Sequence, residues 1–341
     1  MDFIEIIYKI ALSSIILMIS LFVAMYSTLV ERKMAGFFQD RFGPDRAGKW
    51  GILQPLADGI KLFFKEEFVP QNADKFLYVL GPSLTMLIAL LTSAVIPWGT
   101  PVHAGEKVFP LQVADVNVGV LYIFAIVSIG VYGIMIGGWA SNNKYALLGA
   151  VRASSQMISY ELAMGLAIIP IVMISGSLTL NDFVAQQHGF DWNIWKQPLA
   201  FLIFIICAFA ECNRAPFDLP ECETELIGGY HTEYSSMKLG FYLFAEYINM
   251  FISGAIAATL FLGGYNFPFM DHFAAQPNLL AFLCFLSLFL KITFFGFLFM
   301  WVRWTLPRFR YDQLMNLGWK KLIPLALLNI VITGIVLYFK N

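Results

Sequence analysis

An acidic segment inside an otherwise apolar chain contains the residues best suited to proton chemistry. It extends from Cys207 to Tyr247, between long apolar runs, and it contains seven carboxylates. These are Glu211, Asp218, Glu221, Glu223, Glu225, Glu233 and Glu246. Glu211 and Glu246 lie in stretches that otherwise read as lipid-buried helix, where a charge costs roughly 2.5–3.5 kcal/mol. Acids kept at such a cost indicate groups that take up and release protons.

Three of these acids, Glu221, Glu223 and Glu225, are spaced by two residues. Pro216 and Pro220 exclude a regular helix in this part of the segment. Irregular backbone at membrane depth is buried in protein or lines a cavity. Like charges crowded together in such a place are expected to titrate as a coupled group. A solvated acidic loop is the alternative, and the apolar neighbours of the three acids argue against it.

Glu161 is a further acid expected at membrane depth, about two turns into the fourth predicted span. Arg152 and Gln156 precede it on the same stretch. An acid within a span indicates a functional site by default, and simple pairing with a neighbouring helix is the alternative.

The residues that could bind a metal or a redox group show no such pattern. The four cysteines have no C-x-x-C spacing and none lies close to a histidine pair, which argues against a disulfide framework, zinc or an iron–sulfur cluster. The four histidines are scattered, which argues against haem ligation. We therefore expect no metal site, no covalently bound cofactor and no catalytic residue for electron transfer in this chain.

The composition determines the class of protein. Hydrophobic residues make up 59% of the 341 residues, charged residues make up 13%, and the mean hydropathy is +0.70. Soluble domains have about 25% charged residues. The chain is therefore predicted to be a single integral membrane domain over residues 1–341, with no soluble domain. It has no basic stripe, so no nucleic-acid partner is expected.

The apolar runs predict the elements that position these acids. About eight runs are long enough to cross a bilayer, which needs about 20 helical residues. They cover residues 4–30, 76–98, 114–138, 153–175, 197–212, 238–264, 279–302 and 322–339, and the fifth is the shortest. The predicted fold is an all-α polytopic membrane protein with about eight transmembrane helices and an additional interfacial amphipathic helix.

The distribution of lysine and arginine predicts the orientation. With the N-terminus outside, the inner side holds 17 of these residues and the outer side holds 4. Both termini are therefore predicted to be outside. The polar motifs then fall in the inner loops, over residues 31–75, 139–152, 212–237 and 303–321. Chemistry confined to one membrane surface predicts a soluble partner that docks there.

Two of the inner loops contain further features of interest. Residues 54–68 have apolar side chains at helical spacing and charged residues such as Asp58 and Lys61 on the other face. They predict an amphipathic helix that is either a surface anchor or a gate over a lipid-accessible opening. The segment from Arg303 to Gln313 supplies three arginines, including Arg308, which either mark topology or pair with the acidic loop or a docked subunit.

These stretches together closely resemble the H subunit family of respiratory complex I, the proton-pumping NADH:quinone oxidoreductase. The resemblance covers nearly the whole chain in order. It rests on E-R-K at 31–33, R-x-G-P at 41–44, G-x-L-Q-P-x-A-D at 51–58, K-Y-A at 144–146, S-Y-E at 159–161, A-E-x-N-R-x-P-F-D-L-P-E at 210–221, T-E-Y at 232–234 and R-Y-D-Q-L at 310–314.

The resemblance implies a membrane subunit that forms a quinone access tunnel and couples quinone reduction to proton pumping. The residues that it implies for the tunnel are Arg32, Asp58, Lys61, Arg214, Asp218 and Arg308. The residues that it implies for proton coupling are Glu161, Glu211, Glu221, Glu223, Glu225, Glu233 and Glu246. The quinone, ubiquinone or menaquinone, would be the substrate, and FMN and the iron–sulfur clusters would belong to partner subunits.

The same resemblance implies partners and a location. The soluble quinone-reducing B, D and I subunits would dock at the cytoplasmic face, and the A, J, K, L, M and N subunits in the membrane would complete the complex. The location would be the bacterial inner membrane, with both termini periplasmic.

The chain departs from the family pattern at three loop positions, Asp45, Lys49 and Cys222, which leave the named charges intact. Two alternatives come from other classes of protein. A stand-alone secondary transporter could use buried acids as coupling sites, but such folds have inverted repeats and none is evident here. A structural anchor for a hydrogenase-like soluble arm is the other alternative, and neighbouring genes would distinguish it.

Overall fold

The computed structural model describes residues 3–104, 107–219, 226–273 and 275–340. Within these ranges, seven helical segments are long and apolar enough to cross a membrane. They are α1 (Phe3–Phe38), α3 (Lys75–Thr92), α4 (Gly119–Ala140), α5 (Lys144–Ser175), α10 (Ser236–Phe261), α11 (Pro277–Thr305) and the C-terminal segment Tyr311–Phe339. The shortest predicted span corresponds to α8 (Pro198–Glu211), an apolar helix of 14 residues. The prediction of an all-α polytopic membrane protein is confirmed.

Shorter elements connect these helices. They are η1 (Lys49–Gly51), α2 (Gln54–Phe64), η2 (Ser93–Val95), β1 (Val102–Ala104), β2 (Lys107–Phe109), α6 (Leu180–Ala185), α7 (Asn193–Lys196), η3 (Gly229–His231), η4 (Met270–Phe273), α12 (Tyr311–Leu317), the π-helical η5 (Gly318–Leu322) and α13 (Ile323–Lys340). The two strands pair antiparallel, with Val102 opposite Phe109. This hairpin was not predicted from the sequence.

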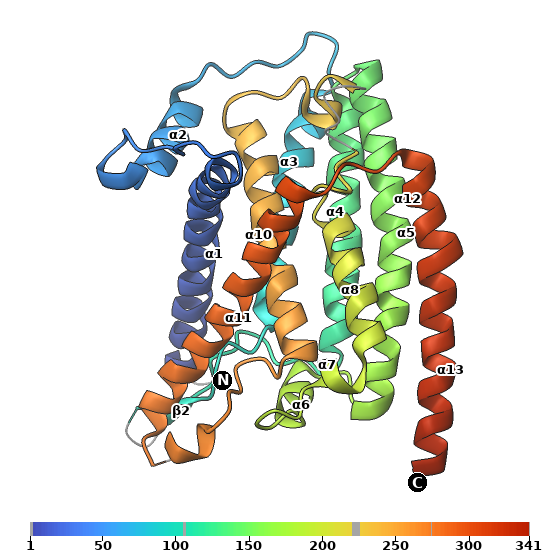
Figure 1. The fold of residues 1–341 in the computed structure, drawn as a ribbon. Helices are drawn as coiled ribbons and strands as arrows, with labels where there is room; N and C mark the ends of the chain where they lie inside the picture. Colours follow the sequence, from blue (N-terminus) through green and yellow to red (C-terminus); the bar gives the residue numbers. More distant parts are fainter. Residues whose placement is uncertain (1–2, 105–106, 220–225, 274, 341) are drawn as a thin grey trace.

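The bundle has two chemically different ends (Figure 1). We call the end that contains α2, the last turns of α1, η3 and α12 the inner end. The opposite end, with the β-hairpin, α6 and α7, is the outer end. Helix α1 begins and α13 ends at the outer end. The two termini therefore lie at the same end of the molecule, as the count of positive charges predicted, while the side of the membrane stays a prediction.

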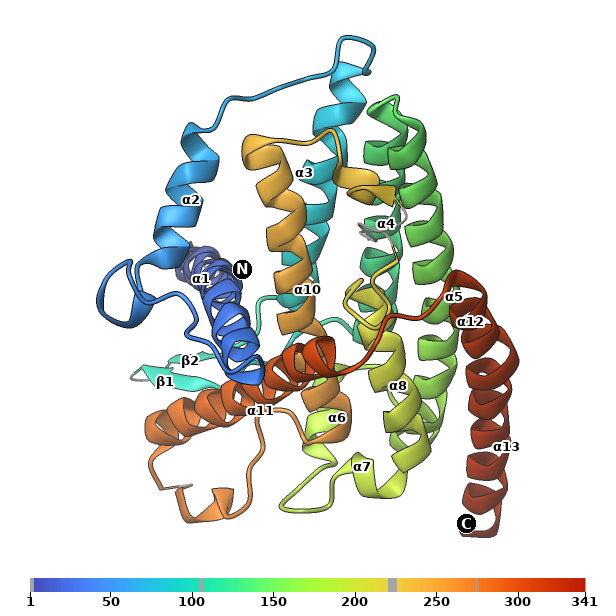
Figure 2. The same ribbon diagram turned by 45° about the horizontal axis from the view of Figure 1, so that its top comes forward.

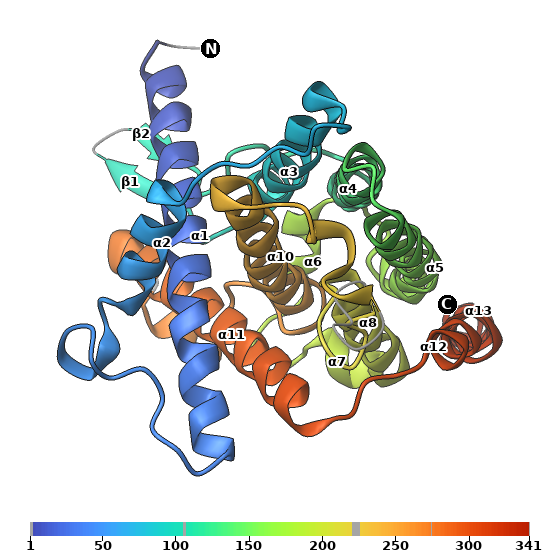
Figure 3. The ribbon, with the colours of Figure 1, turned by 90° about the horizontal axis from the view of Figure 1, so that it is seen from above.

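Helix α10 occupies the centre of the bundle when the molecule is viewed from the inner end (Figure 3). Its most apolar window is 72% buried, whereas that of α1 is 17% buried. Small residues, among them Gly254, Ala255 and Ala258, let neighbouring helices approach α10 closely. Because α10 also carries Glu246, this central position brings an acid into the middle of the protein.

Helices α3 and α4 pack through glycines at the inner half. A Cβ atom on Gly133 would lie 3.0 Å from the carbonyl oxygen of Gly81, so the two backbones are nearly in contact. Tyr234 follows η3, and its hydroxyl lies 3.1 Å from the carbonyl oxygens of Tyr78 and Gly137. Burial raises the pKa of Tyr234 to about 12, so the hydroxyl stays a donor at neutral pH. The η3 region is thereby attached to α3 and α4.

Helix α2 lies outside the bundle, beside the inner end of α1 (Figure 2). Its apolar side chains, such as Leu56, Ile60 and Phe63, are more than half exposed. Its other face contacts the protein, because Ser236 Oγ donates to the carbonyl oxygen of Leu62 at 3.0 Å. Such an exposed apolar face on an amphipathic helix suits the membrane interface. The helix ends at Phe64, four residues before the predicted boundary.

The helices at the inner end are longer than predicted. Helix α1 continues past the predicted boundary at residue 30 to Phe38, so Glu31 and Arg32 are helical. Helix α5 begins at Lys144 rather than at residue 153, because the side chain of Asn143 caps it by accepting from the backbone N–H of Tyr145. Charged residues at these ends hid the continuing helices from an analysis based on hydrophobicity.

Candidate functional site

Four charged side chains meet near the inner end, and we call them the inner ionic cluster: Glu31, Arg214, Glu246 and Arg303. Arg214, in the irregular segment after α8, lies 3.6 Å from Glu31 of α1 and 3.4 Å from Glu246 of α10. Arg303 of α11 forms an ion pair with the other oxygen of Glu31. All but Arg303 are at least nine-tenths buried. Four segments distant in sequence are thus joined by charge at one buried point.

Two tyrosines complete this cluster. Tyr247 donates to Glu31 at 2.8 Å, and its ring lies 4.2 Å from the guanidinium carbon of Arg214. Tyr230 of η3 donates to Glu246 at 3.1 Å. Ion pairs buried in this way are maintained only when additional hydrogen bonds and close contacts offset the loss of water. A change of charge on either carboxylate would therefore alter several contacts together.

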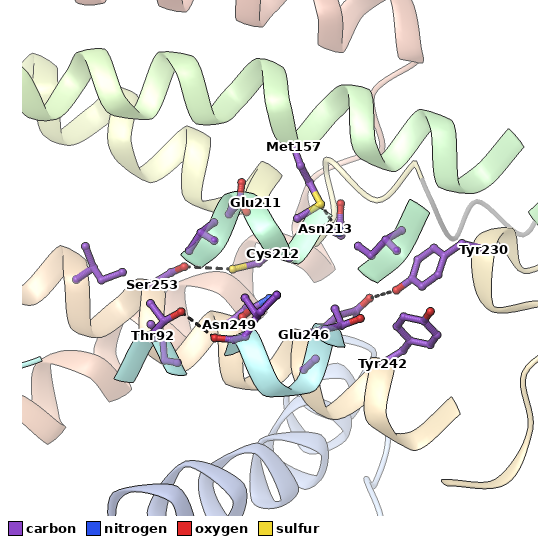
Figure 4. A pocket seen from close by; sticks show the side chains of 18 residues that line it. Thr92, Met157, Glu211, Cys212, Asn213, Tyr230, Tyr242, Glu246, Asn249 and Ser253 are labelled. Atoms are coloured by element: carbon purple, nitrogen blue, oxygen red, sulfur yellow. Dashed lines mark hydrogen bonds between the residues drawn. The ribbon is translucent and has the colours of Figure 1, made fainter. Parts of the chain in front are cut away.

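A small cavity of about 40 Å³, lined by both polar and apolar side chains, includes Glu246 of the inner ionic cluster (Figure 4), and we call it the polar cavity. Its lining includes Glu246 and Asn249 of α10 and Glu211 at the end of α8. Hydroxyl and thiol groups from Thr85, Thr92, Cys212 and Ser253 also line it. A cavity needs about 10–15 Å³ of such volume to hold a water molecule, so this one is large enough for water. Two buried acids from different helices therefore share one space of water size.

Glu211 also contacts a second cavity, of about 30 Å³, which is lined mostly by apolar side chains of α4, α5 and α10. Within the described residues, Oε2 of Glu211 has no hydrogen-bond partner. Its charge interacts with that of Glu161 on α5. Glu161 accepts a hydrogen bond from Ser128 of α4. Glu246 and Glu211 thus share one cavity, and Glu161 is close enough to Glu211 for an electrostatic interaction.

An apolar cavity of about 300 Å³ lies between α1, α10 and α11. Its lining includes Phe22 and Val30 of α1, Met250 of α10 and Phe297 of α11. Tyr247 also lines it, so the cavity reaches the inner ionic cluster. Such a lining can accommodate a hydrophobic chain beside a charged group.

Two further ion pairs lie at the inner surface. Arg32 of α1 is 2.6 Å from Asp58 of α2, and Lys61 is 3.9 Å from the same carboxylate. Arg308, after α11, is 2.9 Å from the buried Asp218, which follows α8. These pairs attach α2 and the segment after α11 to the bundle.

The structure groups most of the predicted site residues but separates some of them. The six predicted tunnel residues fall into three groups, and Arg214 lies with the predicted coupling residue Glu246 rather than with Arg32. Glu233 lies apart from the polar cavity, because it accepts from Asn143 at the corner between α4 and α5. The predicted acids Glu221, Glu223 and Glu225 lie outside the described residues.

The sequence analysis did not identify Glu31, Arg303 and Tyr247 as site residues. The sequence could have indicated Glu31, because this acid directly follows the uncharged stretch of residues 10–30 and is therefore expected at the edge of the membrane. Arg303 had a weaker signal, as the first arginine after an apolar run. No pattern in the sequence indicated that the two would meet, since 272 positions separate them.

In the ranges that the structure describes, no group of three or more histidine, cysteine, aspartate or glutamate side chains could hold a metal ion. The arrangement instead suits proton uptake, charge pairing and the binding of a hydrophobic chain.

Comparison with known proteins gives one consistent family. A sequence profile described as NADH dehydrogenase matches residues 10–334. The chain is 64% identical to an H subunit of NADH-quinone oxidoreductase from Cytophaga hutchinsonii, over 93% of this chain and 92% of that protein. It is 63% identical to the H subunit from Flavobacterium psychrophilum, over 94% of both chains. It is 52% identical to an H subunit from Geobacter sulfurreducens, over 96% of this chain and 95% of that one.

Proposed function

The chain belongs to the NADH dehydrogenase family that includes the H subunit of NADH-quinone oxidoreductase, and we propose that it forms the quinone access tunnel of that complex and couples quinone reduction to proton pumping. It would do so as a membrane subunit that contains no electron-transfer group. The observation that carries this proposal is the polar cavity shared by Glu246 and Glu211, which starts at the inner ionic cluster.

The tunnel part of the proposal is supported by the surfaces beside that cluster. The apolar cavity between α1, α10 and α11 suits an isoprenoid tail, because hydrophobic surface gains by leaving water. At its inner end, the cavity-lining Tyr247 donates to Glu31, which also pairs with Arg214. Arg32, Asp58 and Lys61 would line the approach below α2, and Arg308 with Asp218 would border it on the other side.

The coupling part is supported by the connection between charges. A change in charge at the quinone would alter protonation of Glu221, Glu223 and Glu225, and Arg214 would then redistribute its contacts between Glu31 and Glu246. Because Glu246 and Glu211 share the polar cavity, a proton on one changes the field at the other. Glu161 would receive the next change through its electrostatic interaction with Glu211.

Partners and location follow from the same proposal. The other complex I subunits would surround this chain: B, D and I at the inner end, and A, J, K, L, M and N in the membrane. FMN and iron–sulfur clusters would be held by partner subunits, with ubiquinone or menaquinone as the substrate. The chain would lie in the bacterial inner membrane with its outer end and both termini in the periplasm.

The test uses Glu211→Gln and Glu161→Gln in the assembled complex. Both changes keep the shape of the side chain and remove its charge. We expect proton pumping to fall by about a hundredfold or more for Glu211→Gln, since positioned proton carriers contribute that much. Quinone reductase activity and pumping are measured on the same membranes.

The matched control is Asp191→Asn, which neutralises an exposed acid at the outer end that pairs with Lys196. It should leave both activities unchanged. Normal reductase activity and normal pumping in both glutamine variants would remove the coupling role. Purification of the chain without other subunits would contradict membership of a complex, because a stand-alone transporter travels alone.

A further inference from the structure

Lys291 is a cation within α11 that the proton chemistry above does not use. It is half-buried, and its Nζ donates to three backbone carbonyl oxygens: those of Leu262 at 2.7 Å, Gly264 at 2.7 Å and Asn266 at 2.6 Å. These carbonyls belong to the chain directly after α10, which ends at Phe261. The last carbonyls of a helix and those that follow have no partner within the helix. Lys291 therefore supplies donors to the C-cap residue Leu262 and to the turn that follows α10.

The chain after α10 is shaped to converge on this ammonium group. Gly263 and Gly264 have φ angles of 74° and 56°, a left-handed conformation that favours glycine. The two residues turn the backbone so that carbonyls from alternate residues point to one place. The ring of Trp192 lies 5.5 Å from Nζ and adds a cation–π contact. The negative end of the α10 dipole lies beside the same charge.

The hydrogen bonds determine what this lysine can do. An ammonium group has three donors and no acceptor. All three donors of Lys291 are used by backbone oxygens, which cannot take up a proton. Loss of a proton would leave one carbonyl without a donor and would create a lone pair facing carbonyl oxygens. In the ranges that the structure describes, Lys291 forms no ion pair with a carboxylate. The geometry therefore favours the protonated, cationic form of Lys291.

We propose that the Lys291 ammonium group, bound by three backbone carbonyls, fixes the outer end of α10. It thereby positions Glu246 and Asn249 of the same helix in the polar cavity. The positioning of Glu246 and Asn249 rests on the proposed function. The fixing of the outer end of α10 concerns the fold and can be tested independently of that function. Lys291 acts through α10, so it is a positioning residue.

Neutral side chains reinforce the same anchor. Gln187 donates to the carbonyl oxygens of Thr259 and Leu260, at 3.1 and 3.3 Å, and accepts from the backbone N–H of Gly263. Asn193 of α7 donates to Leu260 at 3.0 Å. We call Lys291, Gln187 and Asn193 together the outer clamp. Because the lysine contributes the only charge among these three, its removal should weaken the outer clamp most.

The experiment compares Lys291→Met and Lys291→Gln with the control Lys196→Met in the assembled complex in membranes. Lys196 is also at the outer end, but its partner is the exposed Asp191. The first readout is hydrogen–deuterium exchange of the amides of Leu262 and Gly264, which donate to the carbonyl of Ala258. The second is the number of protons pumped per quinone reduced.

We expect Lys291→Met to speed exchange of these amides by about tenfold or more, since local opening sets the exchange rate. The ratio of protons to quinone should fall, while the control changes neither quantity. Unchanged exchange in Lys291→Met would overturn the clamp. Faster exchange with an unchanged ratio would overturn the positioning role and leave the proposed function intact. Exchange at the normal rate in Lys291→Gln would show that the positive charge is not required, and would overturn the proposed role of the ammonium group.

The unmodified complex provides a test that requires no variant to assemble. If the clamp exists, the amides of Leu262 and Gly264 exchange about tenfold more slowly than those of η3 at the other end of the same helix. Equally fast exchange at both ends would overturn the proposal. If Glu211→Gln pumps protons normally but the amides of Leu262 and Gly264 exchange slowly, then the proposed function is wrong and the outer clamp is still supported.

Discussion

The two ends of α10 are stabilised by opposite kinds of chemistry. At the inner end, Glu246 meets Arg214, and both belong to a cluster of carboxylates and guanidinium groups. At the outer end, Lys291 and Gln187 bind backbone carbonyls. Side-chain carboxylates change charge with protonation, whereas peptide carbonyls do not. The inner end can therefore respond to a proton, and the outer end is expected to stay as it is.

This difference indicates how a helix can transmit a local change. If both ends were held by titratable pairs, one protonation event would be absorbed by shifts of the whole helix. When the outer end of the helix is held by partners that do not change charge, a protonation event near the inner end changes only the contacts there. The polar cavity begins at the inner end and reaches Glu211, so the residues that would exchange protons lie on the responsive side.

The largest expected effect is that of Arg214→Met at the inner end. The substitution leaves Glu31 and Glu246 buried beside each other without the guanidinium that lies between them. Removing one partner of a buried ion pair costs about 3–5 kcal/mol. We expect the assembled complex to be lost or strongly reduced in membranes, measured by the amount of subunit that co-purifies. Lys196→Met breaks an exposed pair at the outer end and should cost about 1 kcal/mol or less. Equal amounts of both variants would contradict the view that the inner cluster is a desolvated one.

Gln187→Ala tests the neutral outer end and should have the next largest effect. The fully buried amide binds the carbonyls of Thr259 and Leu260, and its oxygen accepts from Asn193 and Gly263. Each buried group left without a partner costs about 1–3 kcal/mol. The thermal midpoint of the complex should fall, and the number of protons pumped per quinone should fall less than in Lys291→Met, because the charged member of the outer clamp is still present. Gln186→Ala is the matched control, because Gln186 is exposed and donates only to the carbonyl of Ser175. A normal midpoint in Gln187→Ala would show that the amide contacts contribute little.

Gly137→Ala tests the close packing that attaches η3 to α4 at the inner end. A Cβ atom at this position would collide with the hydroxyl of Tyr242 and would lie 3.0 Å from that of Tyr234. Overpacking of this kind costs about 1–3 kcal/mol. Gly165→Ala on α5 is the control, since its nearest neighbour would be 4.0 Å away, and alanine improves helix propensity by about 1 kcal/mol. The thermal midpoint should fall for Gly137→Ala and rise for Gly165→Ala. A rise in both would mean that the two tyrosine side chains move aside at little cost in free energy.

The sequence was sufficient to predict the long helices but not their meeting points. Hydrophobic runs located each long helix, and short length marked the run that forms α8 as different. Charged residues caused the errors at helix ends, because Glu31 and Arg32 belong to α1 although they are polar. Hydropathy measures solvation alone, whereas a helix continues as long as each backbone hydrogen bond can form.

The site divides in the same way. The acids Glu211 and Glu246 were identified from their cost in an apolar stretch, which is a local property. Their shared cavity and the role of Glu31 depend on contacts between α1, α8 and α10, which no local pattern encodes. Lys291 falls within the predicted span of residues 279–302, but its partners are backbone carbonyls. Since every residue has a carbonyl, the sequence contains no signal for which of them converge.

The smallest expected effect concerns Asp182, a titratable group at the outer end. Its carboxylate accepts from the hydroxyls of Ser177 and Thr179, and these bonds hold its pKa below the ordinary value. A lowered pKa gives stability that is present above about pH 4 and is lost as the pH falls through the lowered value. Asp182→Asn should therefore reduce the thermal midpoint slightly at pH 6, and the reduction should become smaller as the pH falls below about 4. Because the group is exposed, the difference should stay well below about 1 kcal/mol. A large pH-dependent loss would mean that the outer end also responds to protons, and the contrast between the two ends of the molecule would then fail.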